Sequence, residues 1–290
     1  MKIFILLSLF AFTTHAADER QFPDPNQVYV PGKDIGFSKY LTKSMRATEK
    51  LALTFDDGPD VILTPRVLDS LKSYNVKATF FILTQRINEE TLPIIKRMIA
   101  EGHTVASHHH DHISSDNKTE AVYRAGLKQS IRATTGLMEE ENSLSKEVYY
   151  RFPYGAYGSK KLAYHHMNVM KQVSNELFGD NCINFVFWDI DTADWLDTIT
   201  PAEITQNVMA NLYGGVAYDF EFKNGKYIKK KYNISKPIGG GVVLMHDVHL
   251  RSANAVPMIL EKIKAKGVEI VPLQEVEEYA YNGKECRLRI

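Results

Sequence analysis

The sequence predicts an α/β barrel, with parallel strands inside, helices outside and polar residues gathered at one end. Apolar runs rich in β-branched and aromatic residues alternate with helical patterns along most of the chain, as a parallel barrel requires. Several of these runs end in a cluster of acids, histidines or arginine. Because a barrel builds its site from loops at the carboxyl ends of its strands, this arrangement predicts one shared functional site.

The expected elements follow one another in the order of such a barrel. Apolar runs that favour strands occupy 50–55, 148–150, 185–187 and 241–247. Helical patterns occupy 64–74, 89–100, 120–138, 201–212 and 252–266. An Asn-Gly pair between alternating runs predicts a β-hairpin inserted at about 216–234.

Two adjacent acids, Asp56 and Asp57, end the first apolar run. Adjacent strand residues point to opposite faces, so both carboxylates can serve one site only if the backbone turns there. The dipeptide Gly58-Pro59 permits such a turn. The alternative is a simple strand-to-loop turn, in which one of the two acids caps the helix that begins near Thr64.

A histidine-rich stretch at 101–112 supplies the side chains of a metal site. His108 and His112 lie four residues apart and would share a face if the stretch formed one helical turn. His109 with His112 would fit one face as well, so spacing alone leaves the pair open. Two imidazoles and one carboxylate suit zinc and leave a position for water, which is typical of a catalytic site. A solvated histidine run is the alternative.

Three further polar clusters, at 151–155, 188–195 and 241–247, also follow strand-like runs. In this order, the five clusters resemble the five motifs of the polysaccharide deacetylase family, the carbohydrate esterases built on the NodB homology domain. The resemblance covers about 50–276, which is most of the chain. It implies a distorted (β/α) barrel, a zinc-type metal and hydrolysis of an N- or O-acetyl group on a sugar.

The resemblance implies a metal centre and a general base at the first two motifs. Asp57 matches the carboxylate ligand of the family, and His108 and His112 match its two histidine ligands. Asp56 matches the catalytic base, and Arg151 matches the arginine that orients this base.

The remaining motifs imply the acid and the walls of the acetyl pocket. His246 matches the catalytic histidine, and Asp194 matches the acid that is partnered with it. Tyr154 matches the residue whose backbone N–H helps to hold the oxyanion. Leu244 and Trp195 match the apolar wall around the acetyl methyl group.

Two positions depart from the usual pattern of the family. His109 and His110 stand where the family usually has Ser or Thr followed by a small or aromatic residue. The segment between the third and fourth motifs, which includes 160–182, is longer than the family norm, and so is the segment between the fourth and fifth.

The chemistry itself follows from the residues. An amide is a poor electrophile with a poor leaving group, so the site must polarise the carbonyl, supply hydroxide at neutral pH and protonate the departing amine. Zinc does the first two, and Co²⁺ also suits these ligands. Asp56 can take the proton of the water, and His246 can return a proton because its charge changes near neutral pH.

Length and composition limit the other classes of function. The chain has 290 residues, 44% of them hydrophobic, which is enough for one large domain with a single core. Equal numbers of basic and acidic residues, 35 of each, give a formal net charge of +0. Net charge therefore favours neither a nucleic acid partner nor attraction to a charged membrane surface.

The amino end predicts export. Lys2 precedes an apolar stretch at 3–12, and small residues follow at a suitable cleavage position, so 1–16 has the pattern of a secretory signal peptide. The stretch is too short to span a bilayer. We therefore expect a secreted or periplasmic protein without a stable membrane anchor after cleavage of the signal.

Behind the signal we expect an N-terminal arm at 17–49, laid along the barrel, and a single catalytic domain at 50–290. An exported protein can form disulfides, so the only two cysteines, Cys182 and Cys286, are expected to pair. Two isolated buried thiols are the alternative.

The expected hairpin at 216–234 combines rings and positive charges. Its aromatic residues are Tyr218, Phe220, Phe222, Tyr227 and Tyr232, and its central lysines are Lys226, Lys229, Lys230 and Lys231. Alternation sends one set of side chains outward. The hairpin would then form an aromatic and basic wall that stacks on sugars and meets an anionic glycan, or else a lid that only seals the barrel edge.

The sequence thus predicts a secreted, zinc-dependent polysaccharide N-deacetylase whose substrate is an N-acetylated glycan, with N-acetylglucosamine in peptidoglycan favoured. Chitooligosaccharides or another acetylated glycan, such as O-acetylated xylan, would suit the same residues. A hypothesis of a different class is a glycan-binding protein that kept the fold and lost turnover.

Overall fold

The computed structural model describes residues 41–141, 147–157, 166–281 and 285–289. The expected signal peptide at 1–16 lies outside these residues, as does the expected arm at 17–49 up to residue 40. Within the described ranges, no helix is long and apolar enough to cross a bilayer.

The centre of the molecule is a parallel sheet that contains every strand of the described residues except the two of the hairpin. Its strands are β1 (Lys50–Asp56), β2 (Thr79–Ile82), β3 (Thr104–Ser107), β4 (Val148–Tyr150), β5 (Ile183–Phe185), β6 (Ile190–Asp191), β9 (Gly241–His246) and β10 (Glu269–Ile270). The strand order is β5-β4-β3-β2-β1-β9-β6, and β10 pairs with the beginning of β1. All of these pairs are parallel, so the carboxyl ends of the strands meet at one edge.

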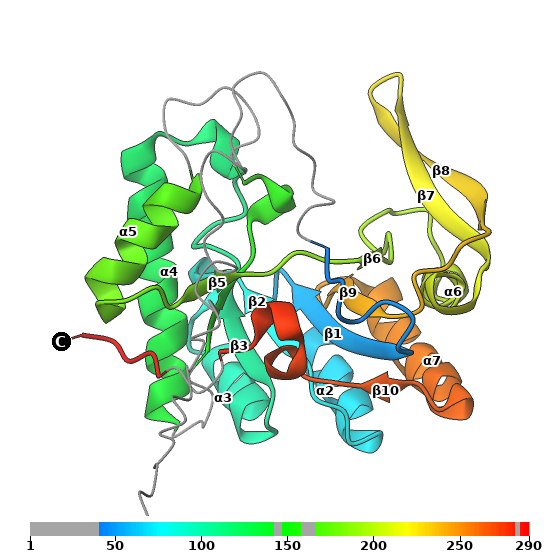
Figure 1. Cartoon of the computed structure of the whole chain (residues 1–290), viewed down its shortest axis with the longest axis horizontal. Helices are drawn as coiled ribbons and strands as arrows, with labels where there is room; N and C mark the ends of the chain where they lie inside the picture. The colour runs from blue at the N-terminus through cyan, green and yellow to red at the C-terminus, as the bar shows by residue number, and fades with distance from the viewer. Residues whose placement is uncertain (1–40, 142–146, 158–165, 282–284, 290) are drawn as a thin grey trace, which may run out of the picture.

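The sheet is strongly curled, and the connection between its two outer strands requires this. In a flat sheet, β5 and β6 would be six strand spacings apart, or about 29 Å. The chain leaves β5 at Phe185 and enters β6 at Ile190, a path that spans about 18 Å at most when fully extended. The two outer strands therefore approach each other, and the expected fold class, a distorted (β/α) barrel, is confirmed (Figure 1).

Helices surround the curled sheet (Figure 1). They are α2 (Leu63–Ser73), α3 (Leu92–Ala100), α4 (Glu120–Glu140), α5 (His166–Phe178), α6 (Pro201–Tyr213) and α7 (Leu250–Lys266). Short 3₁₀ helices lie at Thr84–Arg86, Ser115–Asn117, Pro153–Gly155, Leu273–Glu275 and Glu277–Tyr279. Five of the α-helices coincide with the expected helical patterns to within three residues.

Strands β2, β3, β6 and β10 were not expected, and two other parts of the sequence were interpreted incompletely. Helix α5 was not expected, although the buried residues Met167, Met170, Val173 and Leu177 recur with helical spacing. The strand expected at 185–187 is wrong, because β5 ends at Phe185. The carbonyls of Val186 and Phe187 accept hydrogen bonds from the guanidinium of Arg151 instead.

The inserted chain segment forms an antiparallel hairpin of β7 (Gly215–Lys223) and β8 (Lys226–Ile234). Asn224 and Gly225 at its turn have φ values of 52° and 75°. Two consecutive positive φ values define the type I′ turn that favours Asn-Gly. The hairpin projects beside the carboxyl ends of the strands and next to α6 (Figure 1).

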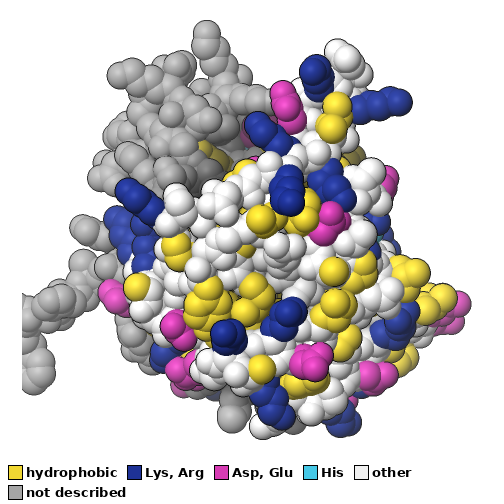
Figure 2. Space-filling model, turned by 90° about the vertical axis from the view of Figure 1, so that its right-hand side faces the viewer, with side chains coloured by type: hydrophobic (Ala, Val, Ile, Leu, Met, Phe, Trp, Pro, Cys, Tyr) yellow, Lys and Arg dark blue, Asp and Glu magenta, His cyan; other side chains and the backbone are white. Residues whose placement is uncertain are grey.

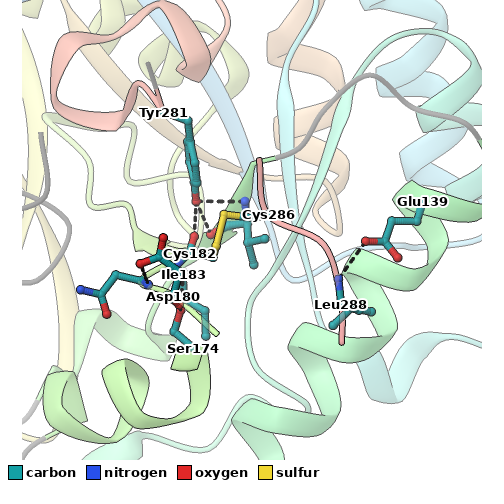
Figure 3. Close-up of a disulfide and its surroundings, with 10 residues drawn as sticks. Glu139, Ser174, Asp180, Cys182, Ile183, Tyr281, Cys286 and Leu288 are labelled. Atoms are coloured by element: carbon teal, nitrogen blue, oxygen red, sulfur yellow. Dashed lines mark hydrogen bonds between the residues drawn. A yellow bond between two sulfur atoms is a disulfide. The ribbon is translucent and has the colours of Figure 1, made fainter. Parts of the chain in front are cut away.

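A disulfide joins Cys182, just before β5, to Cys286 near the carboxyl end of the chain (Figure 3). The alternative of two separate thiols is therefore wrong. The hydroxyl of Tyr281 accepts a hydrogen bond from the N–H of Val148 at 3.0 Å and also contacts the carbonyl of Cys182. These contacts fasten the last part of the chain to the β5 side of the sheet.

Candidate functional site

The site begins at the end of β1, where the backbone turns at Asp57. This residue has a φ of 74°, in the left-handed region that aspartate tolerates better than most residues. The turn lets the carboxylates of Asp56 and Asp57 reach the same site, as the sequence analysis required. The neighbouring glycine has a different role from the one expected: a Cβ at Gly58 would lie 2.3 Å from Oδ2 of the buried Asp247. Glycine is needed at position 58 because a larger side chain would collide with the carboxylate of Asp247.

Three side chains converge at the carboxyl end of the sheet with the geometry of a metal site. Oδ1 of Asp57 lies 3.4 Å from Nε2 of His108 and 3.3 Å from Nε2 of His112. Metal bonds of about 2.0–2.1 Å in a tetrahedral site place neighbouring ligand atoms roughly 3.3 Å apart. Oδ1 of Asp57 is also buried without a hydrogen-bond partner. These donors therefore fit a zinc-type ion, and they form a cluster able to hold one.

His108 is prepared as a neutral ligand. Its Nδ1 donates to the carbonyl of Arg151 at 2.9 Å, which leaves the lone pair of Nε2 directed at Asp57. Burial lowers the pKa of His108 to about 3. The imidazole is thus unprotonated across the neutral range, as metal binding requires.

The segment from His108 to His112 is a loop and not the helical turn that the spacing argument had as its condition. The loop turns at His109, whose φ is 72°, and still brings the rings of His108 and His112 to a centroid distance of 5.3 Å. The alternative pair with His109 does not fit, because this ring lies elsewhere. Its Nε2 contacts the carbonyl of Tyr123, and its ring stacks on that tyrosine at 5.7 Å.

The two histidines that depart from the family pattern both support the loop. Nδ1 of His109 is 3.0 Å from the buried Nζ of Lys118. A Cβ at Gly126 of α4 would lie 2.3 Å from His109, so this helix is open at the point where the ring enters. Nδ1 of His110 contacts Oγ1 of Thr84 at 3.1 Å. Neither imidazole belongs to the cluster of Asp57, His108 and His112.

Arg151 fixes the second carboxylate of the pair. Its Nη1 donates to Oδ1 of Asp56 at 2.7 Å and to Oγ1 of Thr54 at 2.8 Å. Arg151 is fully buried, and its guanidinium lies 4.1 Å from the centre of the Phe81 ring. Burial raises the pKa of Asp56, although the charge of Arg151 opposes this. The other oxygen, Oδ2, is 3.7 Å from Nε2 of His108, at the edge of the metal cluster.

His246 and Asp194 form a second buried pair at the same edge of the sheet. Nδ1 of His246 lies 2.7 Å from Oδ1 of Asp194, whose Oδ2 accepts from the His246 N–H at 2.7 Å and from Oγ of Ser252 at 2.5 Å. Burial by itself lowers the pKa of His246, but the charge and hydrogen bond of Asp194 outweigh it and raise the pKa to about 10. The pKa thus lies above the neutral range expected from the sequence, and the imidazolium is available as a proton donor at neutral pH.

The remaining expected residues border this centre. Tyr154 is exposed, has a φ of 58°, and its ring lies 4.3 Å from the ring of His112. Leu244 is buried two residues before His246 on β9, on the same face of the strand. Trp195 follows Asp194 and contacts the hairpin, with its ring 4.5 Å from that of Phe220.

Comparison with known proteins agrees with the motifs. The family model described as polysaccharide deacetylase matches residues 43–173. Peptidoglycan-N-acetylglucosamine deacetylase PgdA of Listeria monocytogenes serotype 1/2a is 30% identical over 266 residues, which cover 88% of this chain and 47% of the relative. The chain belongs to the polysaccharide deacetylase family. It spans about half the length of this relative.

Solved structures of family members share the fold. A peptidoglycan N-acetylglucosamine deacetylase in complex with 4-naphthalen-1-yl-N-oxidanyl-benzamide is 26% identical, with a TM-score of 0.58 over 86% of this chain and 94% of the other. A family 4 acetyl xylan esterase from Clostridium thermocellum, in complex with a cobalt ion, is 26% identical, with a TM-score of 0.54 over 78% of this chain and 89% of the other.

Sequence reasoning missed several residues that hold the site together. Ser252 bonds Asp194, and the guanidinium of Arg251 donates to the carbonyls of Asp194 and Trp195. The hydroxyl of Thr54 accepts a hydrogen bond from the same Arg151 nitrogen that donates to Asp56. The serine and arginine open α7 directly after the last motif, and this position after a strand is the only signal that could have indicated them.

Proposed function

We propose that this chain is an exported, zinc-dependent deacetylase that hydrolyses the acetamido group of N-acetylglucosamine residues in peptidoglycan. The observation that carries this proposal is the position of Asp56, a carboxylate held by Arg151 at the edge of the Asp57, His108 and His112 cluster. A base beside a three-ligand metal site is the arrangement that hydrolysis of an amide needs.

Asp57, His108 and His112 would hold the ion. When bound, zinc would polarise the acetyl carbonyl and make a water molecule more acidic. Asp56 takes a proton from the attacking water as the new C–O bond forms, and Arg151 keeps the carboxylate in place. The N–H of Tyr154 would stabilise the oxyanion.

The second buried pair completes the reaction. His246, kept protonated by Asp194, donates a proton to the amide nitrogen as the C–N bond breaks, so that acetate and a free amine leave. Leu244 and Trp195 would enclose the acetyl methyl group. Asp56 has then gained one proton and His246 has lost one. Exchange of protons with solvent returns both residues to their starting states for another cycle.

Peptidoglycan is the favoured substrate because the Listeria relative is named for that activity and the sequence begins with the pattern of a secretory signal. The likeness to an acetyl xylan esterase supports an acetylated glycan of another kind as the second candidate.

A substrate panel tests the proposal. The zinc-loaded protein would be incubated with peptidoglycan, chitooligosaccharides and acetylxylan, and acetate release would be measured. Acetate release from peptidoglycan is the expected result. Release from only one of the other two glycans would show that this glycan, and not peptidoglycan, is the substrate. Binding to a glycan without acetate release from any of the three would favour the glycan-binding hypothesis and overturn the enzymatic one.

A further inference from the structure

A continuous path of aromatic rings leads from the proposed acetyl pocket onto the hairpin. The ring of Trp195 lies 4.5 Å from Phe220 and 5.2 Å from Tyr227, and Tyr227 lies 5.0 Å from Phe222. Phe222 and Tyr227 are 63% and 53% exposed. The path therefore begins at the wall of the site and ends in solvent near the hairpin turn.

Positive charge is concentrated at the same end of the hairpin. Lys223 and Lys226 are directly opposite each other in the register of β7 and β8. Like charges in this position repel and destabilise a hairpin. Within the described residues, neither ammonium forms an ion pair with an acid. By contrast, Lys229 is anchored, because it bonds Glu203 at 2.8 Å and the carbonyl of Thr198 at 2.9 Å.

The ring of Tyr227 and the charges of the lysines border one depression. Thr198, Lys223, Lys226, Tyr227 and Lys229 are among the residues that line it. In Figure 2 the hairpin projects at the top of the molecule, where dark-blue and yellow side chains lie next to one another. The formal net charge of the whole chain is +0, so this local field is not a consequence of a basic protein.

We propose that the hairpin tip, defined as Lys223, Lys226 and Tyr227, is a remote subsite for a carboxylate-bearing part of the glycan. Lys223 lies three residues beyond Phe220, or about 10 Å farther along the strand, so the subsite takes a part of the chain beyond the reacting sugar. Tyr227 stacks on a sugar ring, and the two lysines, which line the same depression, bind the carboxylate, which relieves their mutual repulsion. The choice of a glycan rests on the proposed function.

Direct binding tests the subsite without catalysis. Each protein would carry Asp56→Asn to prevent turnover, and binding would be titrated with peptide-substituted peptidoglycan strands and with neutral N-acetylglucosamine oligomers of equal length. The test variant adds Lys223→Gln and Lys226→Gln. The matched control adds Lys171→Gln and Lys262→Gln, which remove two exposed lysines from α5 and α7. A third protein adds Tyr227→Ala.

The tip lysine variant should bind the carboxylate-bearing strands about three- to tenfold more weakly at low ionic strength, and the loss should shrink near 0.15 M salt, roughly the physiological strength. Binding of neutral oligomers should not change, and the unfolding midpoint should stay equal or rise. Tyr227→Ala should weaken binding at both salt concentrations.

Equal losses in the control, or equal losses on neutral oligomers, would overturn the subsite. So would unchanged binding of the carboxylate-bearing strands by the tip lysine variant, or a fall of several degrees in its unfolding midpoint. These outcomes are independent of acetate release, so the failure of the subsite and the failure of the proposed reaction can be told apart.

Discussion

Asp247 occupies the space that a side chain at position 58 would need. The carboxylate of this buried residue would lie 2.3 Å from a Cβ at Gly58, and its Oδ2 accepts a hydrogen bond from Thr64 at 2.5 Å. Asp247 directly follows His246, and Gly58 directly follows Asp57. A packing contact between two loops thus links the proposed metal ligand to the proposed acid.

Gly58→Ala should destabilise the protein by about 1–3 kcal/mol, because the added methyl group overpacks a site with no room. We also expect weaker zinc binding, since the loop with Asp57 must move. Urea unfolding and zinc titration measure the two effects. Gly136→Ala is the matched control: a Cβ there meets nothing within 4 Å, so alanine within α4 should stabilise by about 0.5–1 kcal/mol. Similar free energies for the two variants would contradict the packing argument.

Alanine at Asp57, His108 or His112 should abolish stoichiometric zinc binding, because each removes one of three protein ligands. Metal content after dialysis measures this. His110→Ala is the control and should keep zinc, since its ring contacts Thr84. Loss of zinc in the control together with retention in His108→Ala would show that the ligand set is wrong.

Asp56→Asn should keep zinc and reduce acetate release by about 10²- to 10⁴-fold, the usual contribution of a general base. The amide oxygen can still accept the hydrogen bond from Arg151, so the fold should persist. Zinc content and the unfolding midpoint serve as controls. Undiminished acetate release by this variant would refute the assignment of the base.

Asp194→Asn should move the alkaline limb of the activity profile to lower pH. Asp194 raises the pKa of His246, so its neutralisation lets His246 lose its proton at a lower pH, and the proposed acid is then absent. Loss of a close opposite charge shifts a pKa by about 1–3 units. The pH dependence of kcat measures this, with zinc content checked at each pH. If the alkaline limb does not shift, Asp194 does not control the pKa of the proton donor.

Replacing Cys182 and Cys286 by serine should lower the free energy of unfolding by about 2–5 kcal/mol, because the bond closes a loop between residues 104 apart. Urea unfolding with and without reductant measures the effect. Reductant should lower the midpoint of the native protein and leave the double variant unchanged. If reductant has no effect on the native protein, the bond is not formed in solution.

The sequence was sufficient wherever a local pattern determines the structure. The apolar run of β1, the run of β9 and the Asn-Gly turn all appear where they were expected. The fold class followed from the alternation of such patterns. The expected site residues could be located because each lies near the carboxyl end of a strand, and parallel strands bring those positions to one edge.

Some features depend on a single backbone angle or on a contact between distant residues, and local sequence patterns could not predict them. The positive φ of His109 sends its ring toward α4, and spacing alone could not separate this ring from that of His108. The end of β5 depends on Arg151, which lies more than 30 residues earlier and takes carbonyls that a strand would otherwise use. The contact between Gly58 and Asp247 joins positions nearly 190 residues apart.

The disulfide also determines what a protease could do to this molecule. The exposed hairpin lies between Cys182 and Cys286, so a cut at one of its lysines would divide the chain into two pieces that remain covalently joined. Asp56 and His108 would belong to one piece and His246 to the other. A nicked molecule would therefore keep both halves of the site together, and the cut would become visible only after reduction.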